Sequence, residues 1–322
     1  MDDRTPQEFK RHLCEVSAWA EAAGLRGLLV FSDNDSLDPW AISQFIIERT
    51  ETIVPMVAVN PMYMHPFNVA RLISTIGQMY ARQVDLNFVS GGFKRHLLQV
   101  GSLIDHDERY ARLAEYGEIV ARLLLEPDPV TFNGKYYQVK SASISPRLPP
   151  ELMPRFFVSG SSEACVRVRR ELDAVRLSYP REVIESDEDA PLKDLGVGLG
   201  IIAREDAADA WDIAHRRFPR DEMGEKMHQW ASRIVESRWH IDLAYDAEQG
   251  EARNETYWLY PFRSGRTFSP YLVGSYGDVG NQVSRYVGRG VSAIILDEIS
   301  EPDDLQHTMA ALSCAEKGNA EW

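Results

Sequence analysis

Three small polar residues, Gly160, Ser161 and Ser162, stand between an apolar run and a stretch with helical periodicity. A helix that begins directly after a strand leaves backbone N–H groups free in its first turn, and these groups favour anions such as phosphate. Two hydroxyls beside them would offer further hydrogen bonds to the same anion. Serine is also a common helix N-cap, so a purely structural role stays open at this point. The stretch predicts either a phosphate cradle or a capped helix.

Two other strand ends carry residues with chemical potential. Ser90, Gly91 and Gly92 close an apolar run, and glycines allow a backbone to approach a flat ligand closely. Neighbouring glycines more often mark a turn. His65, before Pro66, follows another apolar run and has acid–base capacity near neutral pH, although a structural place in the loop is equally open.

Short apolar runs that alternate with amphipathic helices would position these residues. Strands separated by helices of about 10–15 residues pair in parallel, and many such units favour a barrel over an open sheet. We therefore predict an α/β fold of the TIM-barrel type, in one domain that spans residues 1–322. The predicted strands are 27–32, 55–60, 84–90, 156–160, 174–178, 197–203 and 292–297, and the predicted helices are 5–24, 39–49, 68–80, 107–125, 163–171, 206–218, 279–288 and 301–314.

The repeat is interrupted in several places. The chain opens on a helix, so the first strand of the barrel is expected to be missing from it, and run 27–32, apolar on every side, is expected to be buried on both faces. Insertions are expected at 91–105, 129–150 and 219–271. In the second, Asn133-Gly134 between two strand-like runs predicts a hairpin with a type I′ turn. The third is rich in Trp and Tyr and is expected to form a lid over one barrel mouth.

Composition excludes several classes of function. The 322 residues include 35 Lys and Arg against 49 Asp and Glu, for a net charge of −14. Nucleic-acid and anionic-membrane surfaces need clustered cations, which this balance disfavours. The three cysteines stand far apart and match neither a disulfide framework nor a thiolate metal site. We expect a cytoplasmic globular protein without a metal centre.

Three motifs in register resemble those of the bacterial luciferase-like flavin monooxygenases, and most closely the alkanesulfonate monooxygenase-related branch. They are His106-Asp-Glu-Arg-Tyr110, Gly160-Ser-Ser-Glu-Ala164, and the late segment Leu272-Val-Gly-Ser with Val291–Leu296. The resemblance extends from about Phe9 to the C-terminal helix. It implies a (β/α)8 barrel that binds reduced FMN at the carboxyl ends of its strands.

The resemblance also implies which residues contact the cofactor. The FMN phosphate would be held by the tyrosine of the first motif and by the glycine and paired serines of the second. The isoalloxazine ring would be flanked by residues that end the third and fourth strands. The implied cofactor-binding residues are Asn60, Val89, Ser90, Tyr110, Gly160, Ser161 and Ser162.

The chemistry that this family implies is oxygen activation. Reduced FMN and O2 give a C4a-peroxyflavin, which oxygenates a small organic or carrier-bound substrate. A separate flavin reductase would supply the reduced FMN, because no G-x-G-x-x-G fingerprint for NAD(P)H opens a βαβ unit here. His65 could face the barrel mouth, and Arg263 and Arg266 in the expected lid could meet an anionic group of the substrate. Members of this family are commonly homo-oligomers, so the resemblance implies a homo-oligomer here.

One strand departs from the alkanesulfonate monooxygenase pattern. Those enzymes carry an Arg-X-His pair where this chain reads Gly198-Leu199-Gly200. The glycines supply neither a cation nor a proton donor, so we do not expect a sulfonate substrate. They would leave space for a bulkier or uncharged substrate, one presented by a carrier for example, unless they serve only to let strands pack closely.

Two other functions stay open. A deazaflavin-dependent oxidoreductase would transfer hydride in place of activating oxygen, and a non-catalytic flavin-binding relative would have lost the chemistry. Binding of FMN, of deazaflavin or of neither separates the three.

Overall fold

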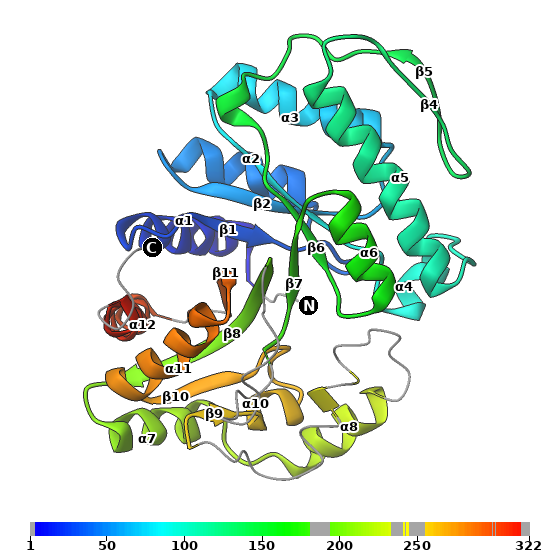
Figure 1. The fold of residues 1–322 in the computed structure, drawn as a ribbon. Coiled ribbons are helices and arrows are strands. Elements are labelled where there is room, and N and C mark those ends of the chain that lie inside the picture. Colours follow the sequence, from blue (N-terminus) through cyan, green and yellow to red (C-terminus); the bar gives the residue numbers. More distant parts are fainter. Residues whose placement is uncertain are drawn as a thin grey trace. The chain divides into compact units, whose positions relative to one another are not determined.

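The computed structural model describes residues 4–180, 194–232, 241, 243–244, 255–297, 299 and 301–316. The chain divides into two compact units, Met1–Arg176 and Leu177–Trp322, referred to below as the first and second units (Figure 1). No helix among the described residues is both long and apolar enough to span a membrane.

The first unit is built on parallel strands in the order β1-β2-β3-β6. Helices connect each strand to the next, which is the arrangement that parallel pairing requires. The strands are β1 (Gly27–Val30), β2 (Val54–Val59), β3 (Asp85–Phe88) and β6 (Phe156–Ser159), and β7 (Val175–Ser178) follows at the unit boundary; the helices are α1 (Pro6–Ala22), α2 (Pro39–Arg49), α3 (Pro66–Tyr80), α4 (Lys94–Gln99), α5 (His106–Leu125) and α6 (Glu163–Glu171), with a 3-10 turn η1 (Pro150–Leu152).

Helix starts in this unit follow the local rules of capping. The Thr5 hydroxyl accepts the Glu8 N–H at 3.3 Å while the Glu8 carboxylate accepts the Thr5 N–H at 2.8 Å, which forms a capping box before Pro6. Asp38 caps α2 by accepting the N–H groups of Trp40 and Ala41 with its side chain. These starts were readable from the sequence, and both are confirmed.

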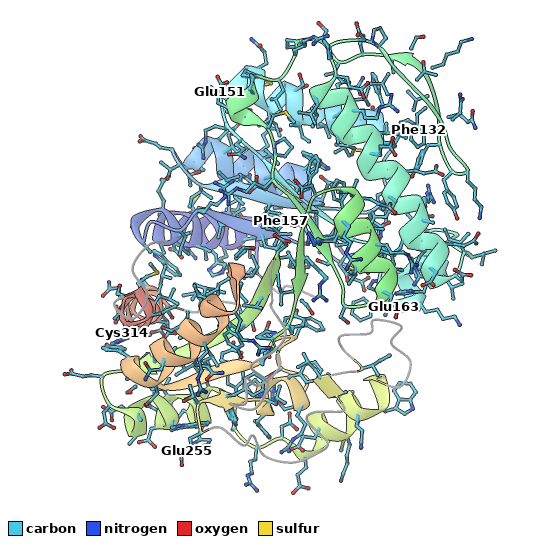
Figure 2. All side chains as sticks on the ribbon, viewed as in Figure 1. Phe132, Glu151, Phe157, Glu163, Glu255 and Cys314 are labelled. Carbon is cyan, nitrogen blue, oxygen red and sulfur yellow. The ribbon has the colours of Figure 1, made fainter. Side chains whose placement is uncertain are left out.

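The core of the first unit lies between its strands and one face of α3 and α5, which run side by side (Figures 1 and 2). Leu86 and Phe88 of β3 are completely buried, as is Leu113 of α5. Burial of large apolar side chains at these positions is the main stabilising contribution to such a layer. It fixes the carboxyl ends of the strands, where the candidate site lies.

The second unit has its own parallel pairings. Strand β8 pairs with β11 along its first half and with β10 along its second half, and β9 pairs antiparallel with β10. Its core includes Val197, Leu199 and Leu272, all essentially buried. The elements are β8 (Leu195–Arg204), α7 (Ala207–Arg217), α8 (Glu222–Ser232), β9 (Tyr257–Trp258), α10 (Tyr260–Arg263), β10 (Tyr271–Ser275), α11 (Tyr276–Gly288), β11 (Val291–Leu296) and α12 (Pro302–Glu316).

The predicted fold class is confirmed as an α/β fold with a mostly parallel sheet. Among the described strands, no pairing closes the sheet into a barrel. The predicted insertions contain α4, the strands β4 and β5, and α8, β9 and α10, while part of 219–271 lies outside the described residues. The single-domain assignment stays a prediction.

The prediction that run 27–32 is a strand buried on both faces is wrong. Strand β1 ends at Val30, Leu29 is 38% exposed and Phe31 is 64% exposed. Within the described part of the chain β1 pairs only with β2, so it lies at the edge of the sheet of the first unit.

The hairpin in the second insertion is confirmed, but its turn type is not. Strands β4 (Val130–Asn133) and β5 (Gln138–Ala142) pair antiparallel with Asn133 opposite Gln138, so four residues connect them. A type I′ turn needs positive φ at both central residues, and Gly134 does not have it. Instead the Gly134 N–H donates to the Tyr137 carbonyl at 2.9 Å.

The carboxylate of Glu115 on α5 is the physical reason for this turn. It accepts the backbone N–H groups of Lys135, Tyr136 and Tyr137 at 2.7, 2.8 and 3.0 Å. Glu115→Gln should destabilise the protein by about 2 kcal/mol, because hydrogen bonds to a charged acceptor are the strong ones. Urea unfolding and amide hydrogen exchange at the three residues measure this. Glu118→Gln on the same helix is the control, and equal losses in both variants would contradict the assigned role.

Candidate active site

The predicted cofactor residues gather at the carboxyl ends of β2, β3 and β6 in the first unit. Asn60 directly follows β2, and Gly160 directly follows β6. Ser90 follows β3 after one intervening residue. Because these strands are parallel neighbours, their carboxyl ends meet at one edge of the sheet. Figure 2 shows β6, marked by Phe157, and the start of α6, marked by Glu163.

Tyr110 of α5 lies at the centre of this group. It is only 4% exposed, and its hydroxyl donates to the Ser159 carbonyl at 2.9 Å. The side chains of Ser90, Ser162 and Cys165 lie beside the same hydroxyl. Burial raises the pKa of Tyr110 well above its ordinary value, so the phenol stays neutral and keeps its proton. The structure thus brings residues of two of the family motifs, together with Ser90, around one neutral hydroxyl.

Gly160 lies so close to its neighbours that no other residue would fit. Its φ is +141°, and a methyl group there would lie 2.3 Å from the Tyr110 hydroxyl oxygen and 3.2 Å from the Cys165 sulfur. Both the backbone conformation and the close approach therefore require glycine. This close-packed turn at Gly160, called the notch below, lies directly before the amino terminus of α6.

The paired serines divide the two roles that the sequence left open. Ser162 is the N-cap of α6, and its hydroxyl accepts the Cys165 N–H at 3.2 Å. The Ser161 hydroxyl oxygen is buried and has no hydrogen-bond partner among the described residues. A buried hydroxyl without a partner is unfavourable by itself. A phosphate oxygen beside the first turn of α6 would satisfy it, so the residues present fit the tail of FMN.

The residues predicted to flank the flavin ring lie at the same sheet edge. Asn60 is 7% exposed, its side-chain oxygen accepts the Met62 N–H at 3.0 Å, and its amide nitrogen faces Gly91. Val89 is half-buried, and its N–H donates to the Val59 carbonyl at 3.0 Å. Their contact with a flavin ring stays a prediction.

His65 has a local structural role. It caps α3, with its Nδ1 accepting the Phe67 N–H at 3.2 Å, and its ring packs edge-on against Tyr137 with centroids 5.7 Å apart. Burial lowers the pKa of His65 below its ordinary value, so the imidazole is neutral at pH 7. Its catalytic role stays a prediction, and one ring nitrogen is already engaged.

The two arginines expected to meet an anionic substrate both have carboxylate partners in the second unit. Arg263 Nε lies 3.1 Å from Glu225, and Arg266 Nη2 lies 2.9 Å from Asp221. An incoming anion would have to compete with these carboxylates. Their role in substrate binding stays a prediction.

The expectation of open space beside the strand glycines is wrong. A methyl group at Gly200 would lie 2.3 Å from the Tyr271 ring, and one at Gly198 would lie 3.0 Å from the Tyr179 ring. The aromatic rings occupy the space that the absent side chains leave, so close packing is the reason for these glycines.

Two loops and one helix of the first unit are joined near the same sheet edge. The Asn34 amide nitrogen donates to the His96 carbonyl at 3.1 Å and to Gln99 Oε1 at 2.7 Å, while the Tyr63 hydroxyl donates to the Asn34 oxygen. The network connects the loops that follow β1 and β2 with α4. It holds the segments that surround the carboxyl strand ends in one arrangement.

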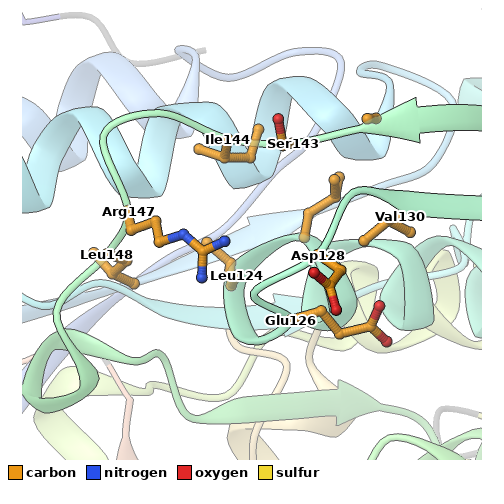
Figure 3. A pocket seen from close by; sticks show the side chains of 10 residues that line it. Leu124, Glu126, Asp128, Val130, Ser143, Ile144, Arg147 and Leu148 are labelled. Atoms are coloured by element: carbon orange, nitrogen blue, oxygen red, sulfur yellow. The ribbon is translucent and has the colours of Figure 1, made fainter.

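A pocket of the first unit lies away from these residues. The C-terminal end of α5 and the hairpin segment line it, among them Leu124, Asp128, Ile144 and Arg147 (Figure 3). None of the predicted site residues contributes to it. We therefore assign it no part in the candidate site.

Two residues at the cradle escaped sequence reasoning. Cys165 is fully buried beside Tyr110, and Arg176 of β7 donates to the Gly160 carbonyl at 3.5 Å. The signal for Arg176 was a lone charged residue inside a short apolar strand, and it was overlooked. Cys165 carried no signal, because a cysteine in an apolar helix face is ordinary.

The Cys165 thiol should be chemically inert. Burial raises its pKa to about 11. At pH 8 only about one thiol in a thousand would then be ionised, and the thiolate is the reactive form. Iodoacetamide followed by peptide mass spectrometry should label the exposed Cys314 in the native protein and Cys165 only after denaturation. Labelling of both at similar rates in the native protein would contradict this environment.

Comparisons with known proteins agree with the fold. A family model described as luciferase-like monooxygenase matches residues 2–293. The chain is 34% identical over 310 residues, 94% of its length and 90% of the relative's, to 4-(gamma-L-glutamylamino)butanoyl-[BtrI acyl-carrier protein] monooxygenase BtrO of Niallia circulans.

Two solved structures share the fold at low sequence identity. One is the oxygenating constituent of 3,6-diketocamphane monooxygenase from Pseudomonas putida in complex with FMN, with a TM-score of 0.68, 13% identity, and coverage of 98% of this chain and 93% of that one. The other is monooxygenase RslO1 from Streptomyces bottropensis, with a TM-score of 0.66, 16% identity, and coverage of 99% and 96%. The expected family and its class of enzyme are confirmed. This chain belongs to the luciferase-like monooxygenase family.

Proposed function

We propose that this luciferase-like monooxygenase binds reduced FMN and uses O2 to oxygenate an acyl group presented on a carrier protein. The observation that carries the substrate class is the 34% identity, over almost the whole chain, to a relative named as an acyl-carrier-protein monooxygenase. The sequence expectation of a carrier-bound substrate agrees with it.

The cradle supports FMN as the cofactor. It combines the notch at Gly160, the unsatisfied hydroxyl of Ser161 and the free N–H groups that open α6. A phosphorylated tail fits these features, whereas a neutral ribityl chain would leave the N–H groups without an anion. FMN in its reduced form would supply the electrons that activate O2.

The protein's own residues would bind and orient this cofactor. Ser161 and the amino terminus of α6 would hydrogen-bond the phosphate, and the neutral hydroxyl of Tyr110 would keep the Ser159–Gly160 turn in place. Asn60 and Ser90, both buried at the strand ends, would flank the ring. The reacting atoms would thus be held at the sheet edge by groups that need no reorganisation.

The strand of the second unit that departs from the sulfonate pattern has no cation at the two changed positions. Gly198 and Gly200 carry no side chain, and Tyr179 and Tyr271 fill the space beside them. Burial raises the pKa of Tyr179 well above its ordinary value, so its hydroxyl is neutral as well. A sulfonate needs a cation, so the lack of one at these two positions agrees better with an acyl substrate.

The remaining parts of the proposal concern the setting of the enzyme. A separate flavin reductase would deliver the reduced FMN, and the enzyme would work as a homo-oligomer in the cytoplasm. The three cysteines, none of which forms a disulfide, agree with a reducing compartment.

The experiment is an oxygenation assay with the purified protein, a flavin reductase, NADH, FMN and a set of acyl-carrier proteins. Mass spectrometry of the carrier should show the gain of one oxygen atom from isotopically labelled O2, with no gain when FMN is replaced by deazaflavin. Hydride transfer with deazaflavin, and no labelled oxygen with FMN, would overturn the proposal. Absence of binding to either flavin would favour a non-catalytic relative.

A further inference from the structure

Arg176 is a half-buried cation at the edge of the phosphate cradle. Its Nη1 donates to the Gly160 carbonyl at 3.5 Å, which fixes the guanidinium to the residue that opens the notch. No carboxylate of the described residues forms an ion pair with it. In this respect it differs from Arg26, Arg204 and Arg217, each of which has an aspartate partner within 3 Å.

The groups that face Arg176 do not neutralise it. They are the Cys165 thiol, the Tyr110 hydroxyl and the guanidinium of Arg169. Burial keeps the first two protonated at neutral pH, and the third carries the same charge as Arg176. Burial also lowers the pKa of Arg176 below its ordinary value, although a guanidinium remains protonated at neutral pH. A cation taken out of water without an anion is unfavourable, and a bound anion would remove that cost.

The chemistry of the side chain selects the anion. A guanidinium has five N–H donors in a planar fork, and only one hydrogen bond of Arg176 is formed within the described residues. Such a fork matches two oxygens of a phosphate group. The buried hydroxyl of Ser161, which also lacks a partner, lies one residue beyond the carbonyl that Arg176 contacts.

We infer that Arg176 binds the 5′-phosphate of the flavin and makes the site selective for FMN over riboflavin. This inference rests on the proposed function, because it assumes a flavin in the cradle. It adds a residue from β7 to a site that otherwise consists of residues from α5, from the carboxyl ends of β2, β3 and β6, and from the start of α6. The residue acts in binding and selectivity, not in the oxygenation step.

The test is a titration of the oxidised flavins with the full chain, followed by flavin fluorescence. Wild type should bind FMN more tightly than riboflavin. Arg176→Gln should weaken FMN binding by about ten- to a hundredfold and leave riboflavin binding within twofold, because a charge-assisted bond acts only on the phosphate. Arg176→Lys, which keeps the charge without the fork, should lie between the two. Arg167→Gln removes an exposed charge from α6 and should change neither affinity.

Inorganic phosphate provides a second readout that does not depend on the flavin ring. It should compete with FMN in wild type and in Arg167→Gln, and much less in Arg176→Gln. Thermal melts check that the variants are folded. If Arg176→Gln does not fold, the same phosphate competition in Arg176→Lys decides, and an unchanged competition constant there would overturn the inference.

Failure of the inference and failure of the proposed function give different results. A wild type that prefers FMN, with the preference retained in Arg176→Gln, overturns the role of Arg176 and leaves the cofactor proposal intact. Equal losses for FMN and riboflavin in Arg176→Gln mean that the residue acts through structure, which also overturns it. If the wild type binds neither flavin, or binds both equally, the proposal of a phosphate cradle is itself contradicted.

Discussion

Gly160→Ala should reduce the affinity for FMN by about ten- to a hundredfold while the protein remains folded. The added methyl group would lie 2.3 Å from the Tyr110 hydroxyl oxygen, and either Tyr110 or the turn must move. Forcing a methyl group into a packed site typically costs 1–3 kcal/mol, and every 1.4 kcal/mol is tenfold in affinity. The movement would fall on the turn whose N–H groups face the phosphate.

Two further variants separate this local effect from general strain. Gly24→Ala is the matched control, because Gly24 also has positive φ but a methyl group there meets nothing within 4 Å. It should lower stability and leave FMN affinity unchanged. Tyr110→Phe removes the oxygen that clashes, so adding it to Gly160→Ala should recover part of the affinity. Wild-type affinity in Gly160→Ala alone would show that the notch is not part of the cofactor site.

Asp85→Ala should lower the free energy of unfolding by about 3 kcal/mol, because three donors, among them the half-exposed Arg26, lose a buried charged acceptor. Asp85 begins β3, and its side chain is 3% exposed. Its carboxylate accepts Arg26 Nη2 at 2.9 Å, Gln83 Nε2 at 3.1 Å and the Arg155 N–H at 2.9 Å. It thus joins the segments that precede β1 and β6 at the amino end of the sheet, opposite to the cradle.

The chain contains a matched control for the effect of burial. Asp35 also pairs with an arginine, Arg95, at 2.9 Å, but its side chain is 62% exposed. Asp35→Ala should change stability by less than about 1 kcal/mol, because water screens an exposed pair. Urea unfolding of both variants gives the comparison. Similar losses at Asp85 and Asp35 would mean that burial does not determine the strength of these ion pairs.

The sequence predicts the helix starts and the strand order well because their causes are local. Thr5 and Asp38 cap their helices through residues two or three positions away, and Ser162 does the same for α6. The gathering of Ser90, Tyr110 and Gly160 was also foreseeable, since parallel strands place their carboxyl ends at one edge. Assigning them to a cofactor came from family resemblance and still awaits measurement.

The features that the sequence did not reveal depend on contacts between distant segments. Glu115 sets the hairpin turn from 20 residues away. Asp85 joins Arg155 across 70 residues. Tyr271 fills the space beside Gly200, which no local pattern around the glycine indicates. In each case a side chain from elsewhere satisfies a group or fills a volume, and only the tertiary fold brings it there.

A crystal structure of the protein with FMN tests the central claim most directly. We predict that the phosphate lies at Gly160–Ser162, hydrogen-bonded to the Ser161 hydroxyl and to the first N–H groups of α6, with Arg176 as its cation. FMN bound with its phosphate elsewhere, or no flavin at this sheet edge under saturating conditions, would contradict the account.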